Sequence, residues 1–261
     1  MIKIKNVVKS YGDSNILDGV SLDIDPGDFV VILGPSGCGK TTLLKSINKM
    51  HPIEKGDIIV DGLSISKWDK VALRKSIGYV IQQVGLLPHL TVRENIEFTL
   101  KLQGLGKTEK NKVSSKLISL MGMNEEILDR RPRELSGGQK QRVGVARALA
   151  ADAEIILMDE PFGAVDEIVR RNLQSEIKRL HKDLGKTIVF VTHDIEEALF
   201  LGTKIVFMDK GRIIQVSSKE ELVFYPKTET VKNFIGRKGI KSLLSEEELD
   251  GIYESKKKEL V

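Results

Sequence analysis

The 261-residue sequence predicts an α/β fold with a mostly parallel β-sheet covered by helices on both faces. Three observations support this class. Short β-branched segments alternate with segments of helical spacing, a glycine-rich loop joins an apolar segment to a helix, and one wholly apolar run ends in two acidic residues. Because 41% of the residues are hydrophobic, the chain can bury a substantial core.

The expected elements follow one another along the chain. Residues 2–11, 20–25 and 28–34 have the β-branched texture of strands, and Pro26-Gly27 marks a turn before the third. Further strands are expected at 56–62, 77–83, 154–161, 187–193 and 204–211, and helices at 41–50, 140–152, 169–185 and 194–202. Between about residues 90 and 151 the texture is helical, which predicts a helical insertion in the α/β core.

Composition excludes several function classes. No apolar run reaches the roughly 18 residues that a membrane-spanning helix needs, and the N-terminus lacks the apolar stretch of a signal peptide. We therefore expect any link to a membrane to pass through partner proteins. The single cysteine, Cys38, cannot form an internal disulfide and is typical of a reducing cytosol. A net charge of +4 with interspersed signs does not predict a nucleic-acid partner.

The glycine-rich loop carries a specific motif. Residues 34–41 read GPSGCGKT and fit the pattern G-x-x-x-x-G-K-[ST] of a phosphate-binding loop, or P-loop. Glycines let backbone N–H groups wrap an anion, and the following helix directs its positive end at the phosphates. Lys40 can neutralise the outer phosphates, and the Thr41 hydroxyl can bind Mg²⁺. The expected nucleotide-binding residues here are Gly34, Pro35, Ser36, Gly37, Cys38, Gly39, Lys40, Thr41 and Thr42.

Two carboxylates follow the apolar run at 155–158. A strand that is apolar at every position suits the centre of a parallel sheet, and ligands bind beyond the carboxyl ends of such strands. Asp159 and Glu160 therefore lie where the nucleotide is expected. Neighbouring strand residues face opposite ways, so that Asp159 can orient Mg²⁺ while Glu160 activates the attacking water as general base.

A second turn suited to an anion distinguishes this chain among P-loop proteins. Leu135-Ser136-Gly137-Gly138-Gln139 comes directly before an expected helix, whose N-terminus favours negative charge. One nucleotide has little use for two such sites in one chain. Two chains arranged head to tail explain both, because each P-loop would hold ATP while Ser136 of the other chain closes over its terminal phosphate.

LSGGQ, at residues 135–139, matches the signature motif of the ATPases of ABC transporters, and the sequence resembles these ATPases over nearly its whole length. The resemblance implies four further roles: Tyr11 stacks on adenine, Gln82 contacts Mg²⁺ and the attacking water, Asp166 ends the D-loop, and His193 contacts the γ-phosphate. Val165 departs from the leucine usual before the D-loop aspartate. Spacing alone cannot choose between Gln82 and Gln83, but the family pattern V-x-Q favours Gln82.

The resemblance also implies a domain organisation. Residues 1–239 would form one ABC ATPase domain with a P-loop NTPase core, an N-terminal antiparallel β subdomain and a helical subdomain at about 90–151. Residues 240–261 would form a short helical extension, with a capping box of Ser245 and Glu248 opening a surface helix.

Substrate class depends on weaker features. Residues 73–92 and 157–174 look most similar to osmoprotectant importers for glycine betaine, choline and related quaternary amines. The resemblance implies transmembrane permease subunits, an indirect extracytoplasmic substrate-binding protein and a place on the cytoplasmic side of the membrane. Importers for nitrate, sulfonates or amino acids have related loops, and an ABC ATPase acting on the ribosome or DNA is a further alternative. A P-loop kinase is disfavoured, because LSGGQ would have no role in it.

Overall fold

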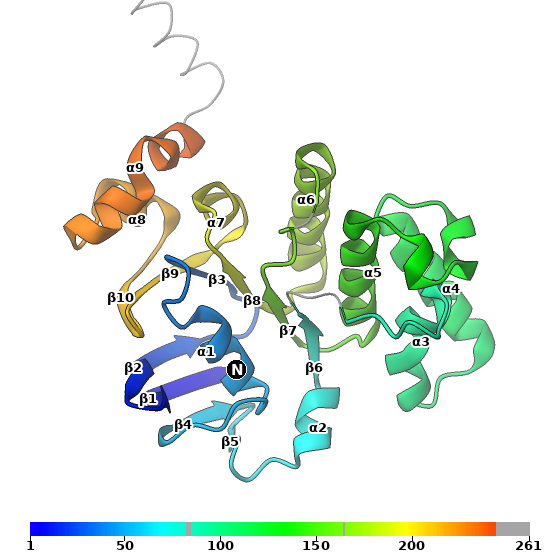
Figure 1. Ribbon diagram of the computed structural model, residues 1–261, viewed down its shortest axis with the longest axis horizontal. Helices are drawn as coiled ribbons and strands as arrows, with labels where there is room; N and C mark the ends of the chain where they lie inside the picture. The colour runs from blue at the N-terminus through cyan, green and yellow to red at the C-terminus, as the bar shows by residue number, and fades with distance from the viewer. Residues whose placement is uncertain (82–84, 164, 244–261) are drawn as a thin grey trace, which may run out of the picture.

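A six-stranded sheet forms the centre of the computed structural model, which describes residues 1–81, 85–163 and 165–243 (Figure 1). The strand order is β10-β9-β3-β8-β7-β6, and every neighbouring pair is parallel except β9 and β10. The strands are β3 (Phe29–Leu33), β6 (Ile77–Val80), β7 (Ile155–Asp159), β8 (Thr187–Thr192), β9 (Lys204–Asp209) and β10 (Arg212–Ser217).

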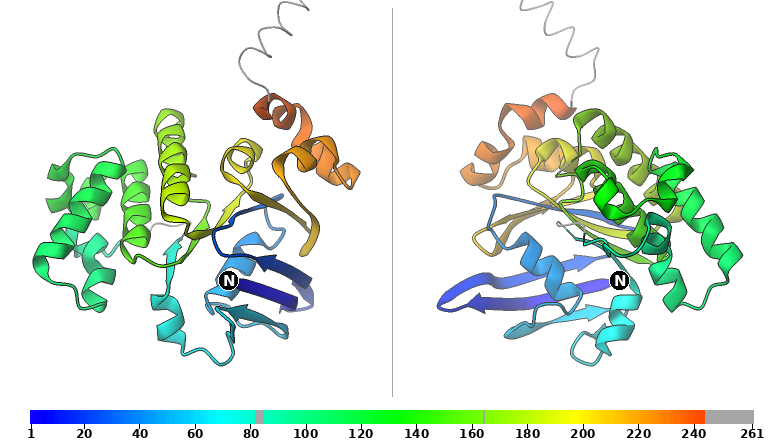
Figure 2. Two further views of the ribbon diagram at one scale, coloured as in Figure 1. Left: turned by 180° about the vertical axis from the view of Figure 1, so that it is seen from behind. Right: turned by 45° about the vertical axis from the view of Figure 1, so that its right-hand side comes forward.

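A second sheet, antiparallel throughout, lies beside the first in all the views (Figures 1 and 2). Its order is β2-β1-β4-β5, with bounds Ile2–Tyr11 for β1, Ser14–Ile24 for β2, Lys55–Val60 for β4 and Leu63–Ser64 for β5. β1 and β2 form a hairpin in which Tyr11 pairs with Ser14, so that the aromatic ring lies at the end of the strand beside the turn.

Both faces of the central sheet are covered, which explains its uninterrupted apolar strands. In β3, Val31 and Leu33 belong to a hydrophobic cluster with the helices that follow β6. Val30 and Ile32 point the other way and pack with the antiparallel sheet and the first helix. All five residues of β3 are buried, as expected of a strand between two layers.

The helices fall into three groups. α1 (Lys40–Ile47) and α2 (Lys70–Lys75) accompany the antiparallel sheet. Between β6 and β7, α3 (Val92–Leu102), α4 (Lys107–Leu120), two short 3₁₀ turns (Glu125–Asp129 and Pro132–Glu134) and α5 (Gly137–Ala150) form a helical region on the β6 side (Figure 1). The third group is α6 (Glu167–Leu184), α7 (Ile195–Leu201), α8 (Lys219–Phe224) and α9 (Glu229–Leu243).

The predicted fold class is confirmed, with differences at element ends. β2 begins at Ser14 rather than at residue 20, because its pairing with β1 continues to the hairpin turn. The helix predicted at 41–50 ends at Ile47, two residues before Lys49 adopts a positive φ of 50°. β5, β10, α2, α8 and the first part of α9 were not predicted. The helix predicted after Ser245 lies outside the described residues, and the domain boundaries stay a prediction.

Within the described ranges, each helix is too short or too polar to cross a bilayer.

Candidate nucleotide-binding site

The P-loop runs from the end of β3 into α1 and depends on its glycines. A Cβ at Gly34 would lie 2.1 Å from the carbonyl oxygen of Met208, and one at Gly39 would lie 2.5 Å from that of Ile16. Both glycines also have positive φ, 155° and 106°. No other residue could take either position without moving the backbone, because the Cβ would collide with main-chain atoms.

Lys40 is buried in this loop without a carboxylate partner among the described residues. It is 5% exposed, and its Nζ donates to the carbonyl oxygens of Gly34 at 2.7 Å and Pro35 at 2.9 Å. A buried ammonium is stabilised by an anion, which neutral carbonyl groups supply only in part. The first turn of α1 has no acidic residue, and Gly39 provides no side-chain cap. These features fit a phosphate group.

The predicted Mg²⁺ ligands meet at the same edge of the sheet. Thr41 Oγ1 donates to Asp159 Oδ1 at 2.8 Å. Asp159 is 1% exposed, and burial raises the pKa of its carboxyl, opposed by the hydrogen bond from Thr41. No group of three potential ligands among His, Cys, Asp and Glu occurs in the described residues. Thr41 and Asp159 supply one hydroxyl and one carboxylate. These donors fit Mg²⁺, which is commonly held by one or two carboxylates together with substrate phosphates.

Glu160 leaves the strand in a conformation unusual for its residue type. Its φ is 45°, and its backbone N–H donates to the carbonyl oxygen of Val191 on β8 at 3.0 Å. One carboxylate oxygen, Oε1, lies 3.4 Å from Nδ1 of His193. Both residues line a cavity of about 90 Å³ beyond the carboxyl ends of β7 and β8. The structure thus brings two of the predicted catalytic residues together.

A buried polar network, which was not predicted from the sequence, holds the residues on either side of His193. Thr192 Oγ1 donates to Glu197 at 2.7 Å, and Gln174 Nε2 donates to the other carboxylate oxygen at 3.3 Å. The backbone N–H of Asp194 donates to the same Thr192 hydroxyl at 3.0 Å. Burial raises the pKa of Glu197, which is 7% exposed. The helical spacing of residues 194–202 placed Glu197 on a helix but did not indicate that it faces inward.

Tyr11 is half-exposed and held on two sides. Lys9 Nζ lies 4.9 Å from the ring centroid, and the phenolic oxygen is hydrogen-bonded to His51 Nδ1. Lys9, 6% exposed, forms an ion pair with Glu54 at 2.6 Å. The rest of the side chain is open to solvent.

Ser136 and Asp166 each begin a helix. Ser136 and Gln139 form a capping box at the N-terminus of α5, and Asp166 caps α6 by accepting from Val169. Ser136 and Gly137 are exposed, and α5 lies with the helical region away from α1 in all the views (Figures 1 and 2). The structure therefore does not bring the LSGGQ turn to the P-loop of its own chain. Gln82 lies outside the described residues.

The comparison with protein families decides what these features belong to. The family model for "ABC transporter" matches residues 17–163, which include the P-loop, LSGGQ and both carboxylates. The chain belongs to the ABC transporter family.

Solved ABC cassettes share the fold. A dimeric cassette, MJ0796, captured after hydrolysis with ADP and phosphate, superimposes with a TM-score of 0.79 at 36% identity, covering 84% of this chain and 98% of that one. At this identity and coverage the likeness extends beyond the core sheet to most of the chain.

Several curated ABC relatives are named for the transport of quaternary amines. The carnitine transport ATP-binding protein OpuCA of Listeria monocytogenes is 50% identical over 91% of this chain and 60% of its own length. The glycine betaine/carnitine/choline transport ATP-binding protein OpuCA of Bacillus subtilis is 48% identical over 91% of this chain and 63% of its own length. The chain thus spans about three fifths of the length of these relatives.

Proposed function

We propose that this chain is the ATP-hydrolysing subunit of an ABC importer for quaternary amine osmoprotectants. The observation that carries the ATPase assignment is the meeting of Thr41, Asp159 and the P-loop at one edge of the sheet, in a chain of the ABC transporter family. Glu160 directly follows Asp159 at the end of β7, and His193 directly follows the neighbouring strand β8.

Each residue has a role that follows from its place. Lys40 would exchange its carbonyl partners for the outer phosphates of ATP, and the glycines would donate backbone N–H groups to them. Thr41 and Asp159 would hold Mg²⁺, together with Gln82. When bound, Mg²⁺ would neutralise charge on the phosphates. Glu160 would accept the proton of the attacking water, and His193, 3.4 Å away, would orient the group being attacked.

The second nucleotide-contacting surface would come from another copy of the chain. Ser136 and Gly137 are exposed at the start of α5, which lies away from α1 (Figure 1), and this helix start has backbone donors to offer an anion. A head-to-tail dimer brings Ser136, Gly137, Gly138 and Gln139 of one copy over the nucleotide of the other. The MJ0796 cassette is dimeric, which supports a dimer of this chain.

The substrate assignment derives from the relatives. Proteins named for carnitine, glycine betaine and choline transport are about half identical to this chain across most of its length. We infer that the chain works with transmembrane permease subunits on the cytoplasmic side of the membrane, and with an extracytoplasmic binding protein that it does not touch. Tyr11 would stack on the adenine of ATP, and Asp166 would lie at the dimer interface.

Uptake measurements test the proposal. Cells that lack this chain should lose osmotically stimulated uptake of radiolabelled carnitine, glycine betaine or choline, and recover it with the unaltered chain but not with Glu160→Gln. The purified chain should hydrolyse ATP only with Mg²⁺. Unchanged uptake of all three solutes would reject the substrate class, whereas absence of ATP hydrolysis from the assembled transporter would reject the ATPase assignment.

A further inference from the structure

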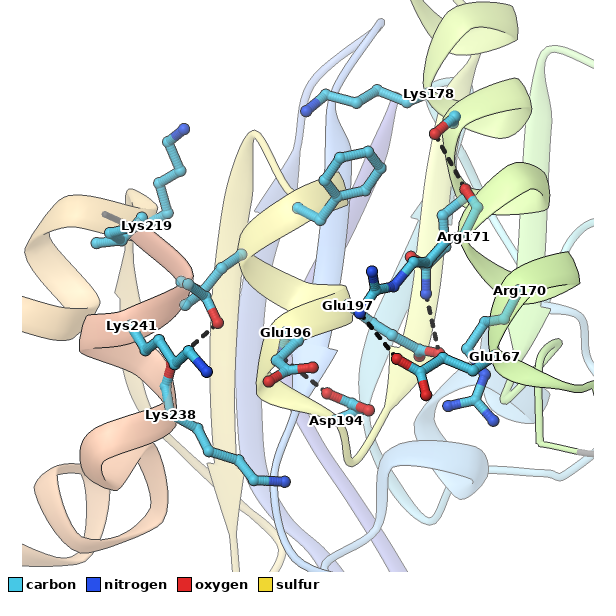
Figure 3. A pocket seen from close by; sticks show the side chains of 16 residues that line it. Glu167, Arg170, Arg171, Lys178, Asp194, Glu196, Glu197, Lys219, Lys238 and Lys241 are labelled. Carbon is cyan, nitrogen blue, oxygen red and sulfur yellow. Dashed lines mark hydrogen bonds and ion pairs between the residues drawn. The ribbon is translucent and has the colours of Figure 1, made fainter. Parts of the chain in front are cut away.

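A large cavity lies among α6, α7, α8 and α9, next to the smaller cavity that holds the proposed catalytic groups. Its volume is about 850 Å³, within the range of small-molecule sites. Figure 3 shows Lys219, Lys238 and Lys241 on the α8 and α9 side, while Lys178 extends from α6 toward them. α9 bends at Gly236, φ 53°, between its first half and the turns that carry Lys238 and Lys241.

The positive charges of this cavity are unbalanced among the described residues. Lys178, Lys238 and Lys241 form no ion pair with any of them, whereas Lys219 pairs with its neighbour Glu220 at 3.6 Å. Three unpaired ammonium groups around one cavity, beside the fourth on Lys219, favour an anionic occupant.

The acidic side chains of the same cavity are mostly engaged. Glu167 is paired with Arg171 at 2.8 Å, and Asp194 accepts from the backbone of α7 at 2.8 Å. Glu197 accepts from Thr192 and Gln174. Glu167 is thus balanced by Arg171, and among the described residues none of the four lining carboxylates forms an ion pair with the lysines.

Lys178 lies beside an exposed aromatic ring that also lines the cavity. Its Nζ lies 4.2 Å from the ring centroid of Phe200, which is 41% exposed. Burial lowers the pKa of Lys178, and the charge of Lys219 lowers it further, so the two ammonium groups repel one another. A bound anion would relieve this repulsion.

One wall of the cavity is shared with the catalytic region. Arg170, Asp194 and Glu197 line both this cavity and the smaller one that holds Glu160 and His193. Glu197 is hydrogen-bonded to Thr192, whose hydroxyl also holds the backbone at Asp194, on either side of His193. A ligand in the larger cavity would therefore touch residues that position the histidine.

We propose that this cavity binds a small phosphorylated metabolite and couples its presence to ATP hydrolysis through the Glu197–Thr192 contact. Lysine ammonium groups suit phosphate as point charges, and Phe200 offers an apolar surface for the organic part. The binding does not depend on the ATPase assignment, whereas the coupling rests on the proposed function. The two are therefore measured separately.

Calorimetric titration tests the binding in a Lys40→Ala background, where the P-loop no longer competes for phosphate. Pyrophosphate and fructose 1,6-bisphosphate serve as probes; tighter binding of the sugar indicates an organic ligand, and tighter binding of pyrophosphate an inorganic one. Adding Lys238→Gln and Lys241→Gln should weaken binding about tenfold, the sum of two modest ion pairs. The matched control is Lys107→Gln with Lys116→Gln on α4, which removes the same charge elsewhere and should change affinity less than about twofold.

Equal affinity in the cavity and control variants would overturn the site. So would binding that appears only after Glu246, Glu247 and Glu248 are changed to Gln, because the acidic segment of the chain itself would then be the occupant. For the coupling, fructose 1,6-bisphosphate should change the ATPase rate of the otherwise unaltered transporter at least twofold, and Lys238→Gln with Lys241→Gln should abolish the change. An equal response in both would overturn the coupling while leaving the binding result intact.

Discussion

The Thr41 hydroxyl donates to Asp159 Oδ1 at 2.8 Å, joining the first turn of α1 to the end of β7 across 118 residues of sequence. Burial of Asp159 raises the pKa of its carboxyl despite this hydrogen bond. Burying a carboxylate lowers the free energy of unfolding when the surrounding groups do not fully compensate its charge. Its presence at the edge where the nucleotide is expected agrees with a functional rather than a stabilising role.

Asp159→Asn should separate function from stability. A carboxyl with a raised folded-state pKa binds its proton more tightly in the folded protein, so the free energy of unfolding falls as pH rises from 3.8 through that pKa. Asparagine does not titrate and can still accept from Thr41. The variant should therefore unfold at the same or a higher temperature at pH 7, by up to about 4 °C for roughly 1 kcal/mol, and lose Mg²⁺-dependent hydrolysis.

Thermal melts monitored by circular dichroism between pH 4 and pH 8 check this prediction. The difference between the melting temperatures of the two proteins should grow as the pH rises. A variant that is less stable than the unaltered chain at pH 7 would show that ionised Asp159 stabilises the fold.

Glu160→Gln should retain ATP binding and lose about a hundredfold or more of the hydrolysis rate, because an amide cannot accept the proton of water. Without hydrolysis, ATP should hold two chains together, and the variant should elute as a dimer in size-exclusion chromatography with ATP. Glu154→Gln is the matched control, because Glu154 directly precedes β7 and lies at the opposite end of this strand from Glu160. This variant should hydrolyse ATP normally. Near-normal turnover of Glu160→Gln would assign the base to another residue.

Cys38 should react slowly with thiol reagents. It is 5% exposed, and burial raises the pKa of its thiol, so less thiolate is present at pH 8 than in a free cysteine. Labelling by an iodoacetamide reagent should be slow at pH 8, accelerate above pH 9 and become slower still with Mg²⁺-ATP. Labelling at the rate of a free thiol, regardless of nucleotide, would place this loop position outside the nucleotide site.

The P-loop and the two acidic residues were predictable because local motifs specify them. A glycine pattern between a strand and a helix indicates that Lys40 and Thr41 lie at the start of the helix. A wholly apolar run indicates a buried strand that ends at Asp159. Their meeting follows from the rule that parallel strands place their carboxyl ends at one edge of a sheet.

Contacts between distant segments were not predictable. The ion pair of Lys9 with Glu54 joins strand β1 to the loop before β4, and nothing in either segment indicates the other. The helical spacing of residues 194–202 does not distinguish Glu197 from an exposed glutamate. Tertiary packing directs its side chain toward Thr192. β10 follows β9 after a two-residue turn, and its partly polar sequence lacks the apolar run by which the other strands were found.

The head-to-tail arrangement is the last prediction. Ser136 lies in the helical region away from α1, so the LSGGQ turn is expected to serve the nucleotide of a second copy (Figure 1). Lys40→Ala and Ser136→Arg chains should each be inactive alone. In a mixed dimer, both lesions fall in one site and leave the other intact, so mixing should restore part of the ATPase activity. If each chain used its own Ser136, no mixed dimer would contain an intact site.

Cross-linking tests the same geometry without requiring one site to work alone. Ser36 and Gly137 are both exposed, and a Cβ at Gly137 meets no atom within 4 Å, so each tolerates a cysteine. Chains carrying Ser36→Cys should form a disulfide-linked dimer with chains carrying Gly137→Cys when ATP is added to hydrolysis-deficient Glu160→Gln versions. Pairs of Ser36→Cys chains alone are the control and should not cross-link. A single chain with both cysteines that closes an internal bond instead would place Ser136 at its own P-loop and reject the shared site.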